Sequence, residues 1–289
     1  HGFSVGHSAH RIRKNSMPLR ESFTHEFPGL VWKLAFDEVG SVPALAAELR
    51  RPDVREAAWA TVNLLENQVI WQGTADVQLD RNEWLSLVGL FDGTLLLHRH
   101  AADTPRPRGL VALDGRTGQC RWDWPGLSFR NCDGHVVLAL LGGREEARVV
   151  RVALKSGEVL EKEPAESVFS EKLPLVSPGL LHYPETGPFF APVAAFVRKR
   201  TGHDPVKAAD YLDAGDCLVI AYYFFANDAL ENWLLIVDKA RNEWVSERLA
   251  SGSGLNPEPF VVYGNRIAHW NSVRVIFVQD KTRLKVYEW

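Results

Sequence analysis

The chain contains 289 residues, of which 46% are hydrophobic and 24% are charged, and its formal net charge at pH 7 is −3. This composition is typical of a globular protein with enough apolar residues for a large core. It does not favour nucleic-acid binding, which uses a concentrated positive charge. No apolar run reaches the ~18 residues that would cross a membrane. We therefore expect neither a nucleic acid nor a membrane as a partner.

Three cysteines, Cys120, Cys132 and Cys217, are spread along the chain without a CxxC spacing. An odd number of cysteines without that spacing argues against a disulfide framework and against a zinc ribbon. We expect reduced thiols in a bacterial, cytoplasmic protein, because disulfides persist mainly in oxidising compartments. One disulfide remains the alternative.

The N-terminal residues, HGFSVGHSAHRIRKNS, lack the apolar stretch of a secretory signal peptide. The one methionine is Met17, and we expect natural translation to start there. On this interpretation residues 1–16 and their histidines carry no functional meaning. We predict a flexible N-terminal segment at residues 1–26, followed by a single domain at residues 27–289.

The strongest pattern in the sequence is a hairpin that recurs along the chain. Each copy consists of an apolar strand, a short polar turn and a second strand, and the copies lie at 57–73, 109–124, 148–164, 232–249 and 273–289. A further pair of apolar segments precedes each copy. Two of these pairs turn at Asp92-Gly93 and Asp133-Gly134, which are strong hairpin signals because glycine adopts a positive φ at little cost.

Four short strands in roughly 40–50 residues match the size of a propeller blade. We therefore predict an all-β protein with a β-propeller fold of five blades, each of four antiparallel strands; six or seven blades are the alternative. Segments such as HVVLALL and CLVIAYYFF are apolar on both faces, as expected for strands buried between neighbouring blades. The patterns exclude a helical bundle and lack the crossover helices of a parallel sheet.

One region, at about 180–212, interrupts the repeat and predicts a helical insertion in the propeller domain. Phe189, Val193, Phe196 and Val197 recur at helical spacing, and Gly202 follows where a helix would end. A second short helix is expected from Pro205 to Leu212.

The hairpin at 109–124 resembles the quinoprotein-type (PQQ-like) propeller repeat, in which a strand ending in Leu-Asp leads through a Thr-Gly turn to a strand with tryptophan. The matching residues are Leu110, Ala112, Leu113, Asp114, Thr117, Gly118 and Trp122. The whole chain also resembles an uncharacterised bacterial family of similar length and unknown function. This resemblance implies a fold and no activity. The paired cysteines and the calcium and quinone sites of quinone dehydrogenases are not found, so we expect no cofactor.

Tryptophans recur in the repeat. Trp71 and Trp122 occupy equivalent positions in their hairpins, and Trp244 lies close to the same position. A repeated position favours a repeated packing role, so we expect these indole rings to dock one blade against the next. A sugar-binding platform is the alternative.

His98 and His100 are two residues apart and therefore point to the same face of a strand. Two imidazoles so placed are weak candidates for metal ligands, but no third ligand is evident, and we assign no metal. Asp37, Asp92 and Asp133 could line a central channel. Each lies in a turn, where aspartate is favoured for its hydrogen bonds to the backbone.

The insertion supplies the candidate binding residues, since insertions on a repeat protein often build its binding surface. These residues are His182, Tyr183, Glu185 and Tyr211. A lid over the channel is the alternative role. The favoured function is a scaffold that binds a protein or a small-molecule ligand. The alternative is a hydrolase or lyase that acts on a carbohydrate-like substrate with channel carboxylates, so the sequence leaves open whether the protein is an enzyme.

Overall fold

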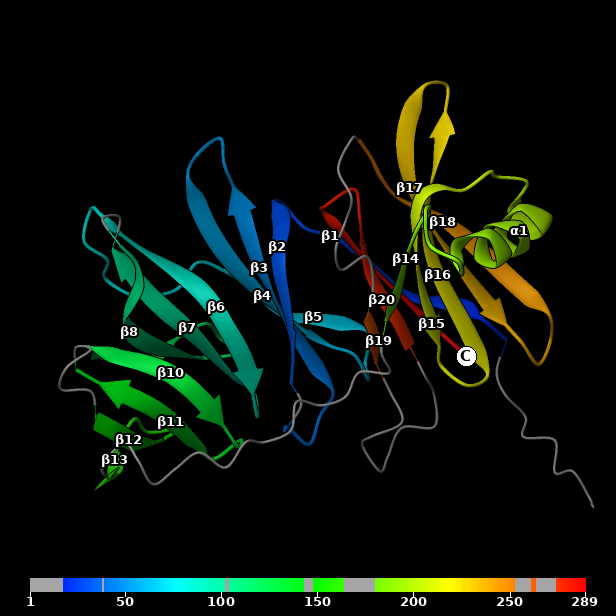
Figure 1. The fold of residues 1–289 in the computed structure, drawn as a ribbon. Coiled ribbons are helices and arrows are strands. Elements are labelled where there is room, and N and C mark those ends of the chain that lie inside the picture. Colours follow the sequence, from blue (N-terminus) through cyan, green and yellow to red (C-terminus); the bar gives the residue numbers. More distant parts are fainter. Residues whose placement is uncertain are drawn as a thin grey trace, which may run out of the picture.

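The computed structural model describes residues 18–37, 39–101, 104–142, 148–163, 180–252, 261–263 and 274–289. Within these stretches the chain forms five antiparallel sheets and one α-helix (Figure 1). We number the sheets I to V. The predicted all-β architecture and its four-stranded units are thereby confirmed.

The first three sheets have the same construction. Sheet I consists of β2 (Leu30–Phe36), β3 (Ala44–Arg51), β4 (Glu56–Asn63) and β5 (Gln68–Gly73). Sheet II consists of β6 (Glu83–Phe91), β7 (Thr94–Ala101), β8 (Thr104–Asp114) and β9 (Cys120–Pro125). Sheet III consists of β10 (Leu127–Cys132), β11 (Val136–Leu141), β12 (Arg148–Ala153) and β13 (Val159–Glu163). In each sheet the strands lie side by side in chain order.

The last two sheets vary this construction. Sheet IV consists of β14 (Leu181–Pro184), β15 (Val206–Asp213), β16 (Cys217–Ala226), β17 (Ala229–Asp238) and β18 (Glu243–Ser251). Helix α1 (Phe190–Thr201) lies between β14 and β15 in the chain. Sheet V has the order β1 (Arg20–Glu26), β21 (Arg283–Glu288), β20 (Arg274–Gln279) and β19 (Val261–Tyr263).

The beginning and the end of the described chain meet in sheet V. Strand β1 pairs antiparallel with β21, from Arg20 opposite Glu288 to Glu26 opposite Arg283. Residues 20–26 therefore belong to the folded domain, which corrects the predicted flexible segment 1–26 at its C-terminal end. The backbone hydrogen bonds of a sheet edge hold these residues, and Arg20 forms an ion pair with Glu288. Residues 1–17 lie outside the described residues.

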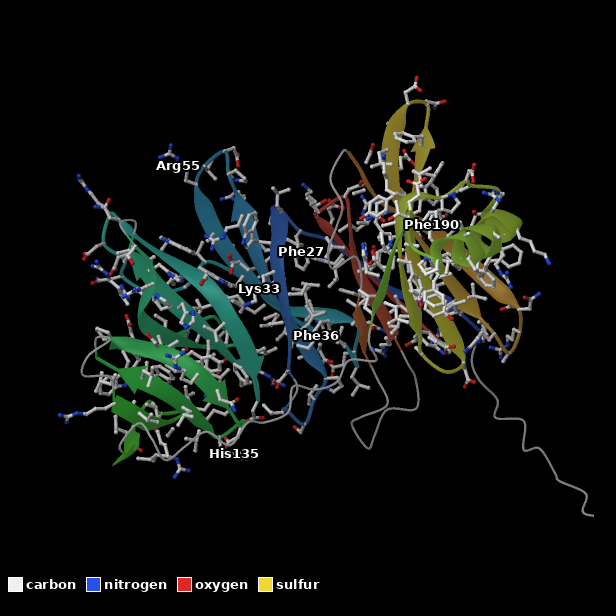
Figure 2. The ribbon with its side chains drawn as sticks, in the orientation of Figure 1. Phe27, Lys33, Phe36, Arg55, His135 and Phe190 are labelled. Atoms are coloured by element: carbon white, nitrogen blue, oxygen red, sulfur yellow. The ribbon has the colours of Figure 1, made fainter. Side chains whose placement is uncertain are left out.

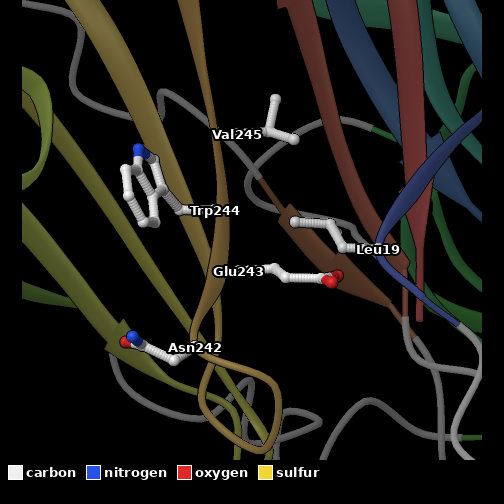
Figure 3. Close-up of a pocket in the computed structure, with 5 residues that line it drawn as sticks. All are labelled: Leu19, Asn242, Glu243, Trp244 and Val245. Atoms are coloured by element: carbon white, nitrogen blue, oxygen red, sulfur yellow. The ribbon is translucent and has the colours of Figure 1, made fainter.

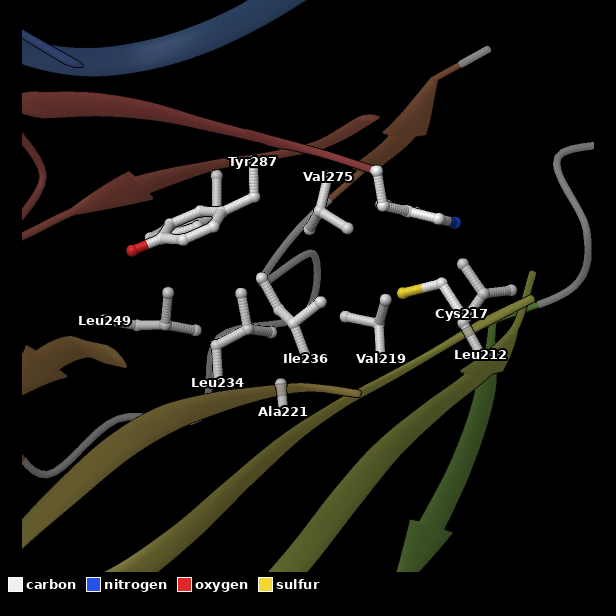
Figure 4. Packing of buried hydrophobic residues seen from close by; sticks show 11 residues of the cluster. Leu212, Cys217, Val219, Ala221, Leu234, Ile236, Leu249, Val275 and Tyr287 are labelled. Carbon is white, nitrogen blue, oxygen red and sulfur yellow. The ribbon is translucent and has the colours of Figure 1, made fainter. Parts of the chain in front are cut away.

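The sheets pack face to face in a row, in the order III, II, I, V and IV (Figure 1). Each neighbouring pair shares one apolar cluster. The cluster between sheets IV and V joins Val219, Leu234 and Ile236 to Val275 and Tyr287 (Figure 4). Sheets III and IV lie at the two ends of the row, and no apolar cluster of described residues joins them.

Burial on both faces explains the uninterrupted apolar strands. In β7, Leu95 and Leu97 enter the cluster with sheet I, whereas Leu96 between them enters the cluster with sheet III. Alternate residues of a strand point to opposite faces, so a strand between two neighbours needs an apolar residue at every position. Polar bridges cross the same gaps: the Lys33 Nζ donates to the backbone carbonyl of Leu87 at 2.9 Å (Figure 2).

Helix α1 covers the face of sheet IV that points away from sheet V. Its residues Val193 and Val197 pack on Ile220 and Leu235 of the sheet. The predicted helix is confirmed, and Gly202 ends it in the left-handed conformation, with φ of 77°. Immediately afterwards the His203 ring stacks on Phe224, 3.9 Å between ring centroids, and its Nδ1 lies 2.8 Å from the hydroxyl of Tyr222.

The predicted second helix from Pro205 to Leu212 is wrong, because this stretch contains strand β15. Ala209 packs against α1, whereas Leu212 packs in the cluster with sheet V. The segment therefore buries side chains on both of its faces. An extended strand between two layers does this, whereas a surface helix buries only one face.

Two tryptophans dock neighbouring sheets as predicted. Trp71 in sheet I packs against Gly118, in the outer turn of sheet II, and Trp122 packs against Gly157, in the outer turn of sheet III. The Trp122 Nε1 also donates to the backbone carbonyl of Leu154 at 2.8 Å. The same device is thus used twice in succession.

Trp244 does not follow this pattern, which corrects the prediction for it. Trp244 lies on β18, the edge strand of sheet IV, and is 45% exposed. It lines an open pocket with Leu19, Asn242, Glu243 and Val245 (Figure 3). Strand β18 contacts sheet V through polar pairs, Arg248 with Asp280 and Glu247 with Lys285. The outer turn of sheet V, residues 280–282, contains no glycine on which an indole ring could dock.

The tryptophan contact gives a prediction for Gly157→Ala. A β-carbon at Gly157 would lie 2.6 Å from Cγ of Trp122, and the residue has φ of 75°. We expect a loss of about 2–4 kcal/mol in the free energy of unfolding, from left-handed strain and displacement of the indole together. Denaturant unfolding measures it.

Gly93→Ala is the matched control, since Gly93 has φ of 67° with no atom within 4 Å of the added carbon. Its free energy of unfolding should fall only by the cost of placing alanine in a left-handed conformation, about 1–2 kcal/mol. Equal losses in the two variants would contradict a docking role for Trp122.

Candidate functional site

The candidate residues from the insertion are placed by a short edge strand, β14. This strand pairs with β15 on one side, with Leu181 opposite Tyr211 and His182 opposite Asp210. Because alternate residues point to opposite faces, Leu181 and Tyr183 lie on the α1 side of sheet IV. His182 lies on the side of sheet V. The structure therefore divides the predicted residues between two faces of one strand.

On the sheet V side, His182 and Asp210 form a hydrogen-bonded pair. The imidazole Nδ1–H donates to the Oδ1 of Asp210 at 2.7 Å. Asp210 is 3% exposed, whereas the side chain of His182 is 56% exposed. Burial raises the pKa of the Asp210 carboxyl, and the hydrogen bond from His182 opposes this shift. The pair thus has a buried acid at its base and an imidazole edge that reaches solvent.

On the α1 side, four side chains form what we call the aromatic patch: Leu181, Tyr183, Phe189 and Tyr211. The ring centroid of Tyr183 lies 5.6 Å from that of Phe189 and 6.0 Å from that of Tyr211. Leu181 and Phe189 are 48% and 62% exposed. Exposed apolar side chains that touch one another mark interaction sites more often than isolated ones do.

Glu185 holds the end of β14 in place, and its predicted part in binding stays a prediction. Its Oε2 accepts the backbone N–H of Lys207 at 2.9 Å, and its own backbone N–H donates to the carbonyl of Lys207 at 2.7 Å. These bonds fasten the end of β14 to the start of β15. Glu185 therefore supports the position of the strand that carries the aromatic patch.

Asp210 is the residue of this site that sequence reasoning missed. The predicted helix over Pro205–Leu212 concealed it. The available signal was the strand KAADYLD, in which an aspartate occupies a position that shares a face with Leu212 in the core. An acidic residue on a buried strand face calls for a partner.

The two histidines considered for a metal site are engaged in packing. The His100 ring stacks on Trp84 at 4.1 Å, and its Nε2 lies 2.9 Å from the hydroxyl of Ser86. Burial lowers the pKa of His98 to about 4, so this imidazole is neutral at pH 7. The rings of His98 and His100 lie edge to face, 5.8 Å apart. The described part of the chain contains no group of three metal-binding side chains.

The three turn acids are engaged in contacts within the fold: Asp37 and Asp133 accept backbone N–H groups, and Asp92 pairs with a lysine. The carboxylate of Asp37 is 2% exposed and accepts the N–H groups of Val39, Gly40, Asp92 and Gly93 at 2.8–3.3 Å. It thereby ties the first turn of sheet I to that of sheet II. The Oδ1 of Asp133 accepts two N–H groups of its own turn at 2.8 and 2.9 Å. Asp92 forms an ion pair of 2.9 Å with Lys155.

One family model is similar to part of the chain. Residues 41–122, from the turn before β3 into β9, match a family described as a domain of unknown function (DUF4905). No curated protein matches the sequence. Among the described residues, no helix is both long and apolar enough to cross a membrane.

Several solved structures are similar to this chain at low identity. A eukaryotic initiation factor is 15% identical, with 90% of this chain and 55% of that chain covered and a TM-score of 0.32. A quinohemoprotein alcohol dehydrogenase from Comamonas testosteroni is 13% identical, with 90% and 42% covered and a TM-score of 0.30. The β-propeller domain of the Trilobed protease from Pyrococcus furiosus is 9% identical, with 90% and 69% covered and a TM-score of 0.26. This chain spans about half the length of the first two structures, and we take no function from these likenesses.

The buried carboxylate of Asp37 gives a second prediction. Asp37→Ala leaves several backbone N–H groups without their acceptor, so we expect a loss of about 2–4 kcal/mol in the free energy of unfolding. Asp133→Ala serves as the control, because its exposed turn bonds can be replaced by water, and it should lose about 1 kcal/mol or less. Denaturant unfolding that shows equal small losses would contradict the structural role of Asp37.

Asp210→Asn gives a third prediction. Unlike Gly157→Ala and Asp37→Ala, it should not lower the free energy of unfolding at neutral pH. The folded-state pKa of Asp210 is raised, so between its unfolded and folded values the folded state binds more protons, and stability falls as pH rises through this range. The asparagine removes the buried charge and still offers Oδ1 to the Nδ1–H of His182. We expect the variant to be at least as stable as the wild type at neutral pH.

The stability difference between Asp210→Asn and the wild type should narrow as the pH is lowered and Asp210 takes up its proton. Thermal unfolding at a series of pH values measures this trend. A clear loss of stability in the variant at neutral pH would show that the ionised carboxylate stabilises the fold.

Proposed function

We propose that the protein is a binding module that holds its ligand at the β14 edge of sheet IV. The exposed aromatic patch carries this proposal. Contact between Tyr183 and its neighbours Phe189 and Tyr211 makes a continuous apolar surface, which is costly to leave in water unless a partner covers it. Tyrosine and phenylalanine supply large contact areas with few rotatable bonds, which favours binding.

The architecture assigned with this function is a five-bladed propeller in which sheets I to V are the blades. Three observations support it: the chain-order strands of sheets I to III, the pairing of β1 with β21, and the shared clusters between neighbours. In such a ring one edge strand of each sheet faces the axis. Strand β14 is the edge strand of sheet IV opposite β18, and the aromatic patch would then open toward the end of the central channel.

The alternative function, a hydrolase or lyase with channel carboxylates, is less well supported. It needs two free carboxyl groups facing a substrate. The carboxylate of Asp37 accepts four backbone N–H groups, that of Asp92 pairs with Lys155, and that of Asp133 accepts N–H groups of its own turn. The described turn acids therefore favour a structural role.

The binding role predicts the effect of a double variant, Leu181→Ser with Phe189→Ser. Both side chains are largely exposed, so the fold should be retained while the apolar surface is removed. We expect the immobilised variant to lose the proteins or small molecules that the wild type retains from a lysate of its source cells, as measured by mass spectrometry.

The matched control is Leu65→Ser with Leu160→Ser, which removes two exposed leucines, 58% and 49% exposed, from sheets I and III. The control should retain the same molecules as the wild type. Loss of binding in both double variants, or in neither, would contradict a site at the aromatic patch.

A further inference from the structure

Asp210 differs from the other buried carboxylates in what it holds. Asp37 and Glu48 accept backbone N–H groups from a neighbouring sheet, Asp238 accepts two N–H groups of its own turn, and Glu288 forms ion pairs with two arginines. Each of these carboxylates has at least two partners. Asp210 contacts His182 on the adjacent strand, and the side chain of His182 is mostly exposed.

The pair is therefore poorly explained by stability. Asp210 loses hydration through burial, which raises its pKa, and gains one hydrogen bond to an exposed ring. Buried ionisable groups with perturbed pKa values are concentrated at functional sites, because the environment that costs stability also tunes proton transfer.

The hydrogen bond determines the chemistry that His182 can offer. With Nδ1–H donated to the carboxylate, the neutral imidazole has its lone pair on Nε2, away from Asp210. An imidazole of this kind accepts a proton from water or a hydroxyl group, and the carboxylate stabilises the imidazolium that forms. The edge position of β14 leaves this atom accessible.

The exposed group of the pair is the imidazole of His182, and this indicates which class of reaction the pair can catalyse. Cleavage of a glycosidic bond uses two carboxyl groups beside the sugar, but here the carboxylate is covered and the imidazole faces solvent. A histidine base is suited to activating water against an acyl ester, whose leaving alcohol needs a proton returned to it.

We propose that His182 and Asp210 form a general-base pair that hydrolyses small acyl esters at the β14 edge. Nε2 of His182 takes a proton from water while the water oxygen bonds to the carbonyl carbon. The bond from that carbon to the alcohol oxygen then breaks, and Nε2–H returns the proton to the leaving oxygen. The products are a carboxylic acid and an alcohol, and the pair is regenerated. His182 is the catalytic residue and Asp210 is the positioning residue.

The test is turnover of p-nitrophenyl acetate by the full chain, followed by release of p-nitrophenolate past one equivalent per protein. His182→Gln should lower the rate at least tenfold. His135→Gln is the matched control, because His135 is also exposed and has no carboxylate partner among the described residues; it should leave the rate unchanged. A wild-type rate no higher than that of His182→Gln, or an equal loss in the control, overturns the proposal.

Asp210→Asn tests the positioning role by separating kcat from KM. The variant should lose at least tenfold in kcat at an unchanged KM, because the carboxylate that stabilises the imidazolium formed in the reaction is gone. A purely structural role would not lower kcat alone, so an unchanged kcat overturns the role of Asp210. Circular dichroism confirms that each variant is folded.

The activity and the binding role are separable. The Leu65→Ser, Leu160→Ser variant changes neither the His182–Asp210 pair nor the aromatic patch and should turn over this small ester at the wild-type rate. Turnover by the wild type without retention of any ligand would overturn the binding role alone. Ligand retention by the wild type without turnover would overturn the activity alone.

Discussion

Burial of both faces of nearly every sheet is the constraint on which this structure depends. A sheet in the middle of the row contributes alternate residues to two different apolar clusters, as Leu95 and Leu96 do in β7. The hydrophobic effect therefore acts across the whole row, and no sheet has an independent core. These shared clusters fix the order of the sheets in the row. In sheet V, the pairing of β1 with β21 joins the beginning of the described chain to its end.

The repeated packing needs repeated small devices at the outer strands. An indole ring from one sheet covers a left-handed glycine in the outer turn of the next, and the absence of a β-carbon is what lets the ring approach. A buried aspartate, Asp37, ties the first turns of two sheets together through their backbone N–H groups. These contacts set the spacing of neighbouring sheets, and they explain most of the residues that resemble functional motifs in the sequence.

Sheet IV is where this regularity changes. Its outer face packs on helix α1 instead of another sheet, its tryptophan Trp244 is exposed, and its first strand carries polar and aromatic side chains at an accessible edge. Side chains here are released from the repeated packing role. The aromatic patch and the His182–Asp210 pair both occur at this strand, on its two faces.

The sequence by itself determined the hairpins, since turn residues and strand periodicity are local, and it located helix α1 and the segment that carries the candidate site. It also indicated Trp71 and Trp122 as docking residues through their repeated positions. Only the tertiary structure decided that Pro205–Leu212 is a strand, that Glu185 fastens β14, and that Asp210 lies beneath His182. Those features depend on which layers cover the two faces of a segment. Residues 28 positions apart in the chain meet there through strand pairing, which local patterns do not encode.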